Sequence, residues 1–303
     1  MKVFITGGSG FIGRKVVQRL AEAGHEVTIL SRSERAVPPE LREKISLCQG
    51  DPTRKGPWQE VAADHEGIIN LAGASIFKRW SPAYKETILS SRVLTARNLV
   101  QALAQRSAGQ TTVLVSASAV GYYGFRGDEE LTETDPPGDD FLARVCQAWE
   151  AEADKAHESG VRVVRTRFGI VLGQGGGSLA QMAPLFKKGL GGKLGTGRQW
   201  FSWIHIEDLA RALLRCLEEG SLSGPVNLTA PHPVTNQELT QALGQALHRP
   251  AFLTVPEFAI KLKMGEFGSV VLKGQRVMPG VLTQAGFEFR FPRLEEALAD
   301  LVR

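Results

Sequence analysis

Short apolar runs rich in β-branched residues alternate with longer amphipathic stretches along the first half of the chain. The runs predict six strands, with helical patterns between most of them: Val3–Thr6, Glu26–Leu30, Ile45–Leu47, Ile68–Leu71, Thr112–Val115 and Val161–Thr166. This alternation is typical of a parallel sheet covered by helices on both faces. The sequence therefore predicts an α/β fold with a doubly wound parallel sheet.

The pattern changes after about residue 168, where glycine-dense segments predict loops around one helix. A helix at Ile206–Glu219 and a strand at Val226–Leu228 follow, and further helices are expected near 235–248, 256–264 and 293–302. No internal repeat or clear linker separates these parts. We expect a sheet domain of residues 1–168, to which 200–228 return, and a smaller C-terminal substrate lobe of residues 169–199 and 229–303.

Composition limits the classes of function that need to be considered. The 303 residues are 43% hydrophobic and 22% charged, and 36 basic against 32 acidic residues leave a net charge of +4 without any long basic run. This composition is typical of a globular protein that binds neither nucleic acid nor membrane. Three scattered cysteines and the absence of a signal peptide pattern predict a reducing, cytoplasmic location. Six histidines without ligand spacing give no indication of a metal site.

The most specific motif is the stretch VFITGGSGFIG at the start of the chain. Gly7, Gly10 and Gly13 fall between the first predicted strand and an amphipathic helix. Gly7 allows a tight turn, Gly10 lets the backbone approach a pyrophosphate, and Gly13 lets helix and strand pack closely. The helix N-terminus, at Phe11 and Ile12, then offers free N–H groups to phosphates. We therefore expect a Rossmann-type dinucleotide-binding domain.

The end of the second strand indicates which dinucleotide is bound. Proteins that bind NAD usually place an acid there, whereas this chain has Ser31, Arg32 and Ser33. Arg32 can pair with the 2′-phosphate of NADP(H), and Ser31 or Ser33 can donate a further hydrogen bond. The sequence therefore predicts NADP(H) as the cofactor. The alternative is that Arg32 is a solvated surface charge.

Two later strand ends complete the predicted cofactor site. Asp51 follows the third strand, where it can contact the adenine, although an Asp before Pro is also common in turns. The stretch NLAGA ends the fourth strand with small residues, so that Leu71, Ala72 and Gly73 are expected to let the cofactor ribose lie against the backbone.

Several motifs together carry a resemblance to a known family. TGGSGFIG, NLAGA, VSASAVGYYG and SWIHIEDLA resemble the extended branch of the short-chain dehydrogenase/reductase superfamily, which includes sugar-nucleotide epimerases. NLAGASIFKRW, FLARVCQAWE and LKGQRVMP further resemble an atypical, epimerase-like group once labelled as cell-division-inhibitor-like. The resemblance covers nearly the whole chain. It implies a Rossmann-type fold, NADP(H) binding and a C-terminal substrate lobe.

The resemblance also implies a catalytic residue and exposes a departure from the family pattern. Ser118 falls at the position of the catalytic serine, where its hydroxyl would donate to the substrate oxygen. The expected tyrosine falls on Leu142, or on Phe141 if the alignment shifts by one residue, and the expected lysine falls on Cys146 or Val145. No Tyr-x-x-x-Lys occurs anywhere in the sequence.

Another residue would therefore have to supply the proton. Tyr122 and Tyr123, shortly after Ser118, are the best candidates, because their loop is expected to border the nicotinamide. Their alternative role is to form a wall of the pocket. Cys146 lies in an apolar helical stripe, which favours a core thiol.

Two hypotheses of function remain. The first is an NADP(H)-dependent oxidoreductase or epimerase-like enzyme that acts on a small molecule with an altered proton relay, as a monomer or a homodimer. The second is a cofactor-binding protein with reduced catalysis that acts through a protein partner. The intact Ser118 favours the first hypothesis, and the absent tyrosine and lysine favour the second.

Overall fold

A seven-stranded, wholly parallel sheet forms the centre of the protein. The computed structural model describes residues 1–34, 39–43, 45–107 and 109–302. Across the sheet, the strands lie in the order β12 (Gly224–Leu228), β7 (Arg162–Phe168), β5 (Val113–Ala119), β4 (Gly67–Asn70), β1 (Lys2–Thr6), β2 (Glu26–Ser31) and β3 (Ile45–Gln49). The chain thus starts in the middle, runs outward to β3 and returns to build the other half. The prediction of a doubly wound α/β fold is confirmed.

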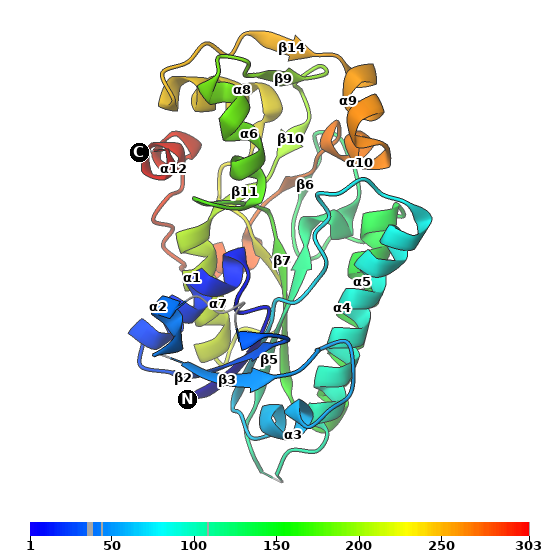
Figure 1. The fold of residues 1–303 in the computed structure, drawn as a ribbon, viewed down its shortest axis with the longest axis vertical. Coiled ribbons are helices and arrows are strands. Elements are labelled where there is room, and N and C mark those ends of the chain that lie inside the picture. Colours follow the sequence, from blue (N-terminus) through cyan, green and yellow to red (C-terminus); the bar gives the residue numbers. More distant parts are fainter. Residues whose placement is uncertain (35–38, 44, 108, 303) are drawn as a thin grey trace.

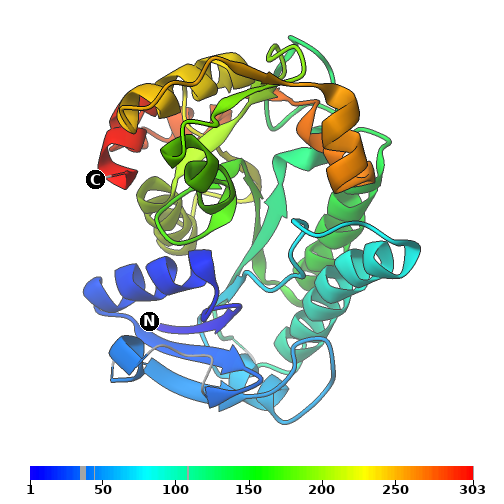
Figure 2. The same cartoon turned by 45° about the horizontal axis from the view of Figure 1, so that its top comes forward.

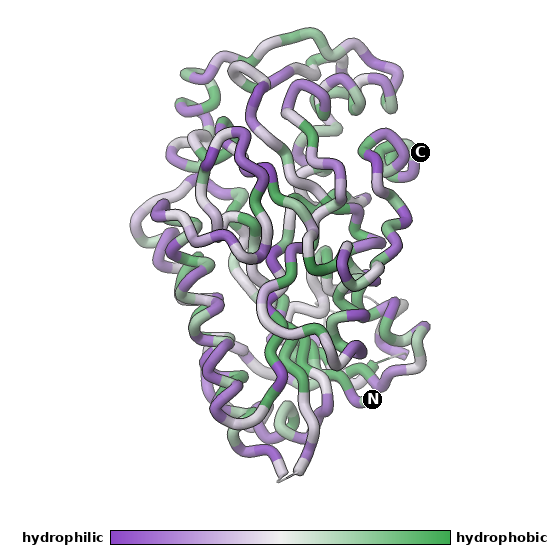
Figure 3. The backbone as a smooth tube through the Cα atoms, turned by 180° about the vertical axis from the view of Figure 1, so that it is seen from behind, coloured by the Kyte–Doolittle hydropathy of each residue, from purple (hydrophilic) through white to green (hydrophobic). Residues whose placement is uncertain are grey.

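Helices cover both faces of this sheet (Figure 1). One face carries α1 (Phe11–Glu22) and α7 (Ile206–Glu218), which pack on each other and bury Val17, Leu20 and Leu213 against the strands. The other face carries α3 (Trp58–Ala63), α4 (Pro82–Leu103) and α5 (Phe141–Asp154). The strands between these layers are apolar, as the hydrophobic colouring of the sheet in Figure 3 shows. Burial on both sides is the physical reason for their continuous apolar runs.

The C-terminal part forms a second layer of structure above the carboxyl ends of the strands (Figure 2). Its own apolar core is centred on Trp203 and Leu243. It contains the helices α6 (Gly177–Lys187), α8 (Asn236–Ala246), α9 (Glu257–Met264), α10 (Glu266–Val271) and α12 (Leu294–Leu301). The intervening helix α11 (Gly280–Gln284) packs instead on β12 and buries Leu282 in the core of the main sheet. Strand β12 lies in the main sheet, as the expected division into domains requires, but the division itself stays a prediction.

Four pairs of short strands link this lobe internally and to the sheet domain. They are β8 (Ile170–Leu172) with β11 (Trp203–His205), β9 (Gly192–Leu194) with β14 (Leu253–Val255), β10 (Trp200–Phe201) with β13 (Val234–Thr235), and β6 (Glu130–Leu131) with β15 (Arg276–Val277). The sequence predicted only loops over residues 187–199, and this prediction is wrong for β9. A strand of three residues is too short to show a period of two, so its partner far along the chain determines it.

The remaining elements are short. They are α2 (Pro39–Arg42) and the two 3₁₀ helices η2 (Val120–Tyr123) and η3 (Lys155–Ser159). The helix α5 ends at Asp154, and the chain continues directly as η3. Gly160 then closes the segment with a positive φ of 74°, a conformation that glycine adopts without strain.

Candidate functional site

The turn between β1 and α1 is built so that only glycine fits at two of its positions. Gly7 has a φ of +73°, and a Cβ atom there would lie 2.8 Å from the carbonyl carbon of Leu71. A Cβ atom on Gly13 would overlap the carbonyl oxygen of Gly7. The turn, the first helix and the loop after β4 are therefore packed backbone against backbone.

The N-terminus of α1 meets the requirements of a phosphate site. Gly10 is the N-cap with φ −76° and ψ 176°, it has no side chain to cap the helix, and the first turn contains no acid. The N–H of Gly10 donates to the carbonyl of Gly7 over 3.0 Å, which holds the turn in place. The N–H groups of Phe11, Ile12 and Gly13 belong to the first helical turn, where no helical carbonyl can accept from them. A pyrophosphate fits such an N-terminus.

The side chain of Phe11 contacts the C-terminal lobe. Its ring lies against the backbone of the turn before α6, where a Cβ atom on Gly173 would be 2.7 Å and one on Gly177 3.0 Å from ring carbons. A Cβ atom on Gly176 would lie closer still to the ring of Phe11. Only the backbone of Phe11 is thus placed toward a phosphate, and its ring joins the turn to the lobe.

The residues at the ends of β2 and β3 lie close together. Ser31 is buried, and its hydroxyl donates to the carbonyl of Ser33 over 2.8 Å, whereas Arg32 is exposed. Asp51 accepts from the N–H and the hydroxyl of Thr53 at 2.9 and 2.7 Å. Burial raises the pKa of Asp51, but these bonds and the charges of Arg32 and Arg54 outweigh it, so the pKa is lowered. Arg32 therefore lies near the Asp51 carboxylate and remains open to solvent.

Hydrogen bonds fix the loop after β4 against β1. The hydroxyl of Thr6 donates to Asn70 over 2.7 Å, and the N–H of Leu71 donates to the carbonyl of Thr6 over 3.0 Å. The N–H of Ala72 lies 3.4 Å from the Thr6 hydroxyl. This arrangement leaves Gly73 exposed beside the glycine turn.

Ser118 belongs to a buried polar network that the sequence analysis missed. Its hydroxyl donates to Oε1 of Glu150 over 2.6 Å, and Arg167 holds both oxygens of the same carboxylate at 2.9 Å. These three side chains are 2%, 4% and 2% exposed. Because the Ser118 proton is engaged by Glu150, the oxygen of Ser118 can accept a further hydrogen bond without any rearrangement. It can donate to a substrate oxygen only after it releases Glu150.

Tyr123 belongs to the same buried hydrogen-bond network. Its hydroxyl donates to Asn227 over 2.7 Å and accepts from Nη1 of Arg167 over 2.9 Å, and the side chain is completely buried. Burial, which outweighs the charge of Arg167 and the hydrogen bonds, raises the pKa of Tyr123 to about 12. As positioned, this hydroxyl links η2 to β7 and β12 and is not available to a substrate. The network continues to Glu133, which accepts from the N–H groups of Asn227 and Val281 over 2.9 and 3.1 Å.

Tyr122 is the more accessible of the two candidate tyrosines. It is half-buried, and the guanidinium carbon of Arg167 lies 3.4 Å from its ring centroid. Its hydroxyl has no hydrogen-bond partner among the residues that the structure describes and is not fully buried. Tyr122 is thus more accessible than Tyr123, and a catalytic role for either residue stays a prediction.

The structure places Leu142 and Cys146 beside the loop after β5. A Cβ atom on Gly121 would lie 3.4 Å from the Cβ of Leu142 and 4.0 Å from the sulfur of Cys146. Burial raises the pKa of Cys146 to about 11, so its thiol stays protonated near neutral pH. Neither side chain reproduces the charge of the lysine or the acidity of the tyrosine that relatives in the wider superfamily are expected to carry.

Sequence reasoning also missed Arg92, which extends from α4 toward this region. Its guanidinium carbon lies 5.2 Å from the Trp149 ring centroid and would lie 3.0 Å from a Cβ atom on Gly73. Glu150, Arg167 and Arg92 each left a signal in the sequence, since all three are charged residues in segments whose neighbours form apolar stripes.

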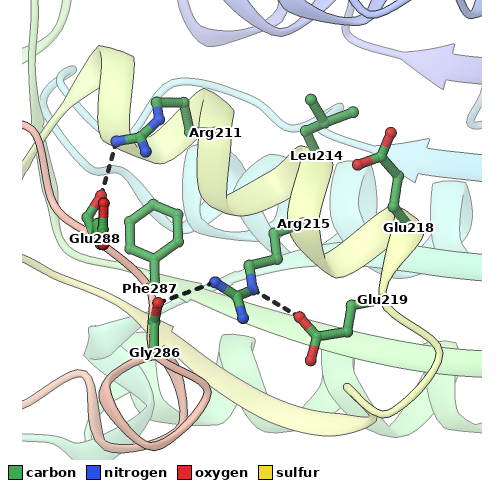
Figure 4. A pocket seen from close by; sticks show the side chains of 8 residues that line it. All are labelled: Arg211, Leu214, Arg215, Glu218, Glu219, Gly286, Phe287 and Glu288. Carbon is green, nitrogen blue, oxygen red and sulfur yellow. Dashed lines mark hydrogen bonds and ion pairs between the residues drawn. The ribbon is translucent and has the colours of Figure 1, made fainter.

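A separate pocket lies away from these residues. It has a volume of about 510 Å³, and it is formed by α7 and the loop after α11 (Figure 4). Its arginines are satisfied locally, since Arg211 donates to the carbonyl of Glu288 over 2.8 Å and Arg215 to Glu219 over 2.6 Å. None of its residues belongs to the predicted cofactor or catalytic set, so we do not regard it as the candidate active site.

Comparison with known proteins identifies the family. Residues 3–228 match the model of the NAD dependent epimerase/dehydratase family, which covers more than half of the chain. The chain belongs to the NAD dependent epimerase/dehydratase family. Residues 255–301 of this family member match a further domain of unknown function, DUF1731. The expected resemblance to epimerase-like short-chain dehydrogenases/reductases is confirmed.

Individual relatives in the family match over nearly the full length. The epimerase family protein SDR39U1 homolog of Arabidopsis thaliana, named chloroplastic, is 41% identical and covers 100% of this chain and 87% of its own. YfhF of Bacillus subtilis is 39% identical, with 100% and 98% covered. The crystal structure of human SDR39U1 with NADPH superimposes with a TM-score of 0.86 at 34% identity and covers 99% of both chains.

The described part of the family member contains neither a helix suited to cross a membrane nor a cluster suited to hold a metal ion. No described helix is both long and apolar enough to cross a membrane. No group of three or more His, Cys, Asp or Glu side chains among those residues is arranged to hold a metal ion. The cytoplasmic location stays a prediction, and one relative is named as chloroplastic.

Proposed function

We propose that this chain is an NADP(H)-dependent oxidoreductase or epimerase-like enzyme that acts on a small molecule. The observation that carries the proposal is the glycine turn at Gly7, Gly10 and Gly13, which brings the N-terminus of α1 and the loop after β4 together with no side chain between them. The human relative was crystallised with NADPH, which agrees with the cofactor expected from the sequence.

The residues present fit NADP(H). The N–H groups at the start of α1 would hold the pyrophosphate, and Leu71, Ala72 and Gly73 would lie along a ribose. Arg32, exposed at the end of β2, would bind the 2′-phosphate. Asp51 is hydrogen-bonded to Thr53 and lies near Arg32. It would therefore orient the Arg32 guanidinium and also border the adenine.

When bound, NADP(H) supplies hydride chemistry. The chain itself supplies a fixed polar frame, in which Glu150 and Arg167 hold Ser118 in one orientation. In that orientation Ser118 accepts from a substrate hydroxyl. Tyr122, whose ring lies against the Arg167 guanidinium and whose hydroxyl has no described partner, is the group we assign to proton exchange with the substrate.

One observation favours the second hypothesis, a cofactor-binding protein with reduced catalysis. Leu142 and Cys146 occupy the place beside Gly121 where the proton relay is expected, and burial raises the Cys146 pKa to about 11. Under this hypothesis the protein binds NADP(H) with the same residues, and a protein partner recognises the loaded form.

The test is a fluorescence titration with NADPH and NADH, which uses energy transfer from the five tryptophans. We expect NADPH to bind more tightly, and Arg32→Ala to weaken NADPH binding about 10- to 100-fold while it leaves NADH binding nearly unchanged. The control is Arg249→Ala, which removes an exposed arginine far along the chain. Equal binding of both cofactors by the unaltered protein would contradict the proposal.

Turnover separates the two hypotheses once binding is established. Oxidation of NADPH by any carbonyl compound, reduced in Tyr122→Phe, supports the enzyme. Tight NADPH binding without turnover, together with a partner that prefers the loaded form, supports the second hypothesis.

A further inference from the structure

The strongest unexplained feature of the protein is the charge of Arg92. The side chain is half-buried, yet the residues that the structure describes provide no carboxylate to pair with it. By contrast Arg97, one turn later on α4, is paired with Glu152 at 3.1 Å. An arginine taken partly out of water without a counter-ion is unfavourable unless a ligand supplies one.

The hydrogen bonds of Arg92 show which donors are free. Nη1 donates to the carbonyl of Ile88 over 3.0 Å, within the same helix. Nε and Nη2 have no acceptor among the described residues, and neither is one of the fully buried atoms without a partner, so both reach solvent. These two atoms form the side edge of the guanidinium, which matches the two oxygens of a carboxylate.

The surroundings hold this edge in place. Trp149 of α5 lies 5.2 Å from the guanidinium carbon, and the backbone of Gly73 lies close on another side, since a Cβ atom there would be 3.3 Å from Nε. Any larger residue at position 73 would displace the guanidinium. The side chain is therefore fixed between α4, α5 and the loop after β4.

Arg92 places a positive charge close to the thiol of Cys146. Burial lowers the pKa of Arg92, and the Cys146 thiol is close enough to interact with its charge. Cys146 is one of the two residues, with Val145, that fall at the expected lysine position, so a cation from a different helix is present in the region from which the lysine is missing. A guanidinium there remains charged at all ordinary pH values.

From these observations we infer that Arg92 is a substrate-binding residue that takes a carboxylate side-on through Nε and Nη2, so that the substrates of this protein are small molecules bearing a carboxylate. The inference rests on the proposed function, because a substrate contact at Gly73 requires the cofactor to lie along the same loop.

The test is a titration of the full chain with acetate and with oxamate, and with neutral acetamide as the matched ligand, followed by tryptophan fluorescence. We expect saturable binding of both carboxylates and none of acetamide. Because Trp149 lies against Arg92, the signal should be lost in Trp149→Phe, and calorimetry then verifies that this variant still binds the carboxylates. Arg92→Gln should weaken carboxylate binding about tenfold or more. Arg92→Lys keeps the charge but loses the paired N–H donors of the guanidinium, so its affinity should fall between those of the unaltered protein and Arg92→Gln.

Controls make each outcome decisive. Arg144→Gln removes an exposed arginine of α5 and should leave carboxylate binding unchanged. Equal binding of acetamide and acetate, or unchanged carboxylate binding in Arg92→Gln, would overturn the inference. The inference would also be overturned if the protein bound no carboxylate and Arg92→Gln weakened NADPH binding, since Arg92 would then be a cofactor contact.

The experiment also separates this inference from the proposed function. Carboxylate titrations are made without NADPH and then repeated with it. Carboxylate binding that depends on Arg92 in a protein that does not bind NADPH would support the anion site and refute the proposed function. NADPH binding without any carboxylate binding would support the cofactor site of the proposed function and refute the anion site at Arg92.

Discussion

The Ser118 hydroxyl donates to the Glu150 carboxylate across 2.6 Å, in a part of the protein from which water is almost entirely excluded. Arg167 neutralises that carboxylate from the next strand of the sheet. The expected catalytic serine is therefore attached to a buried ion pair. Removal of the Glu150 charge leaves Arg167 without a counter-ion in a medium of low polarity, whereas Glu150 also has Arg165 within 3.5 Å.

Glu150→Gln should lower the free energy of unfolding by about 3–5 kcal/mol, because it leaves Arg167 without its buried counter-ion. Urea unfolding followed by circular dichroism measures this loss. Glu158→Gln, which changes an exposed residue shortly after α5, serves as the control and should change stability by less than about 0.5 kcal/mol. Similar losses in both variants would mean that the ion pair contributes little.

Gly13→Ala should abolish detectable NADPH binding and destabilise the fold, since its Cβ atom would overlap the carbonyl oxygen of Gly7. The matched variant is Gly220→Ala, because a Cβ atom there meets nothing within 4 Å. Fluorescence titration measures the affinity, and thermal unfolding measures the stability. If Gly13→Ala folds and binds NADPH as the unaltered protein does, the turn is not the cofactor site.

Stability should fall steeply at alkaline pH. Burial raises the pKa of Cys146 from 9.0 to about 11, and that of Tyr123 from 10.0 to about 12. The unfolded chain therefore loses these protons first, so that the stabilisation is complete below pH about 9 and is lost as the pH rises through 11 and 12. Urea midpoints measured from pH 8 to pH 12 test this expectation.

Tyr123→Phe provides the specific control for the alkaline loss. It should reduce the part of the pH dependence above pH 10, and at pH 8 it should cost about 1–3 kcal/mol, because Arg167 and Asn227 lose a buried partner. A variant whose alkaline loss is as steep as that of the unaltered protein would show that Tyr123 does not cause it.

The sequence was sufficient for those parts of the site that depend on local geometry. Gly7, Gly10 and Gly13 are close in the chain, and the contact that requires glycine at position 13 is made within the turn itself, with the carbonyl oxygen of Gly7. The strands of the main sheet were predicted for a related reason, since burial on both faces leaves a continuous apolar run in each. Their observed bounds differ by only a few residues.

The buried network could not be predicted in the same way. Ser118 and Glu150 meet only because α5 packs on β5, and Arg167 joins them only because β7 lies beside β5. Nothing in the local pattern distinguishes the buried Tyr123 from the more accessible Tyr122, which is its neighbour in sequence. The roles of these residues follow from contacts between segments that are far apart in the chain.

The contact of Phe11 with the glycines before α6 has a consequence for engineering. The ring occupies the space that side chains at 173, 176 and 177 would need, so the two segments are complementary in shape although they are distant in sequence. A chimera that takes its C-terminal lobe from a relative must therefore inherit residue 11 and this turn from the same parent. Without that match, the side chain of residue 11 would either clash with the turn at residues 173–177 or leave a void beside it.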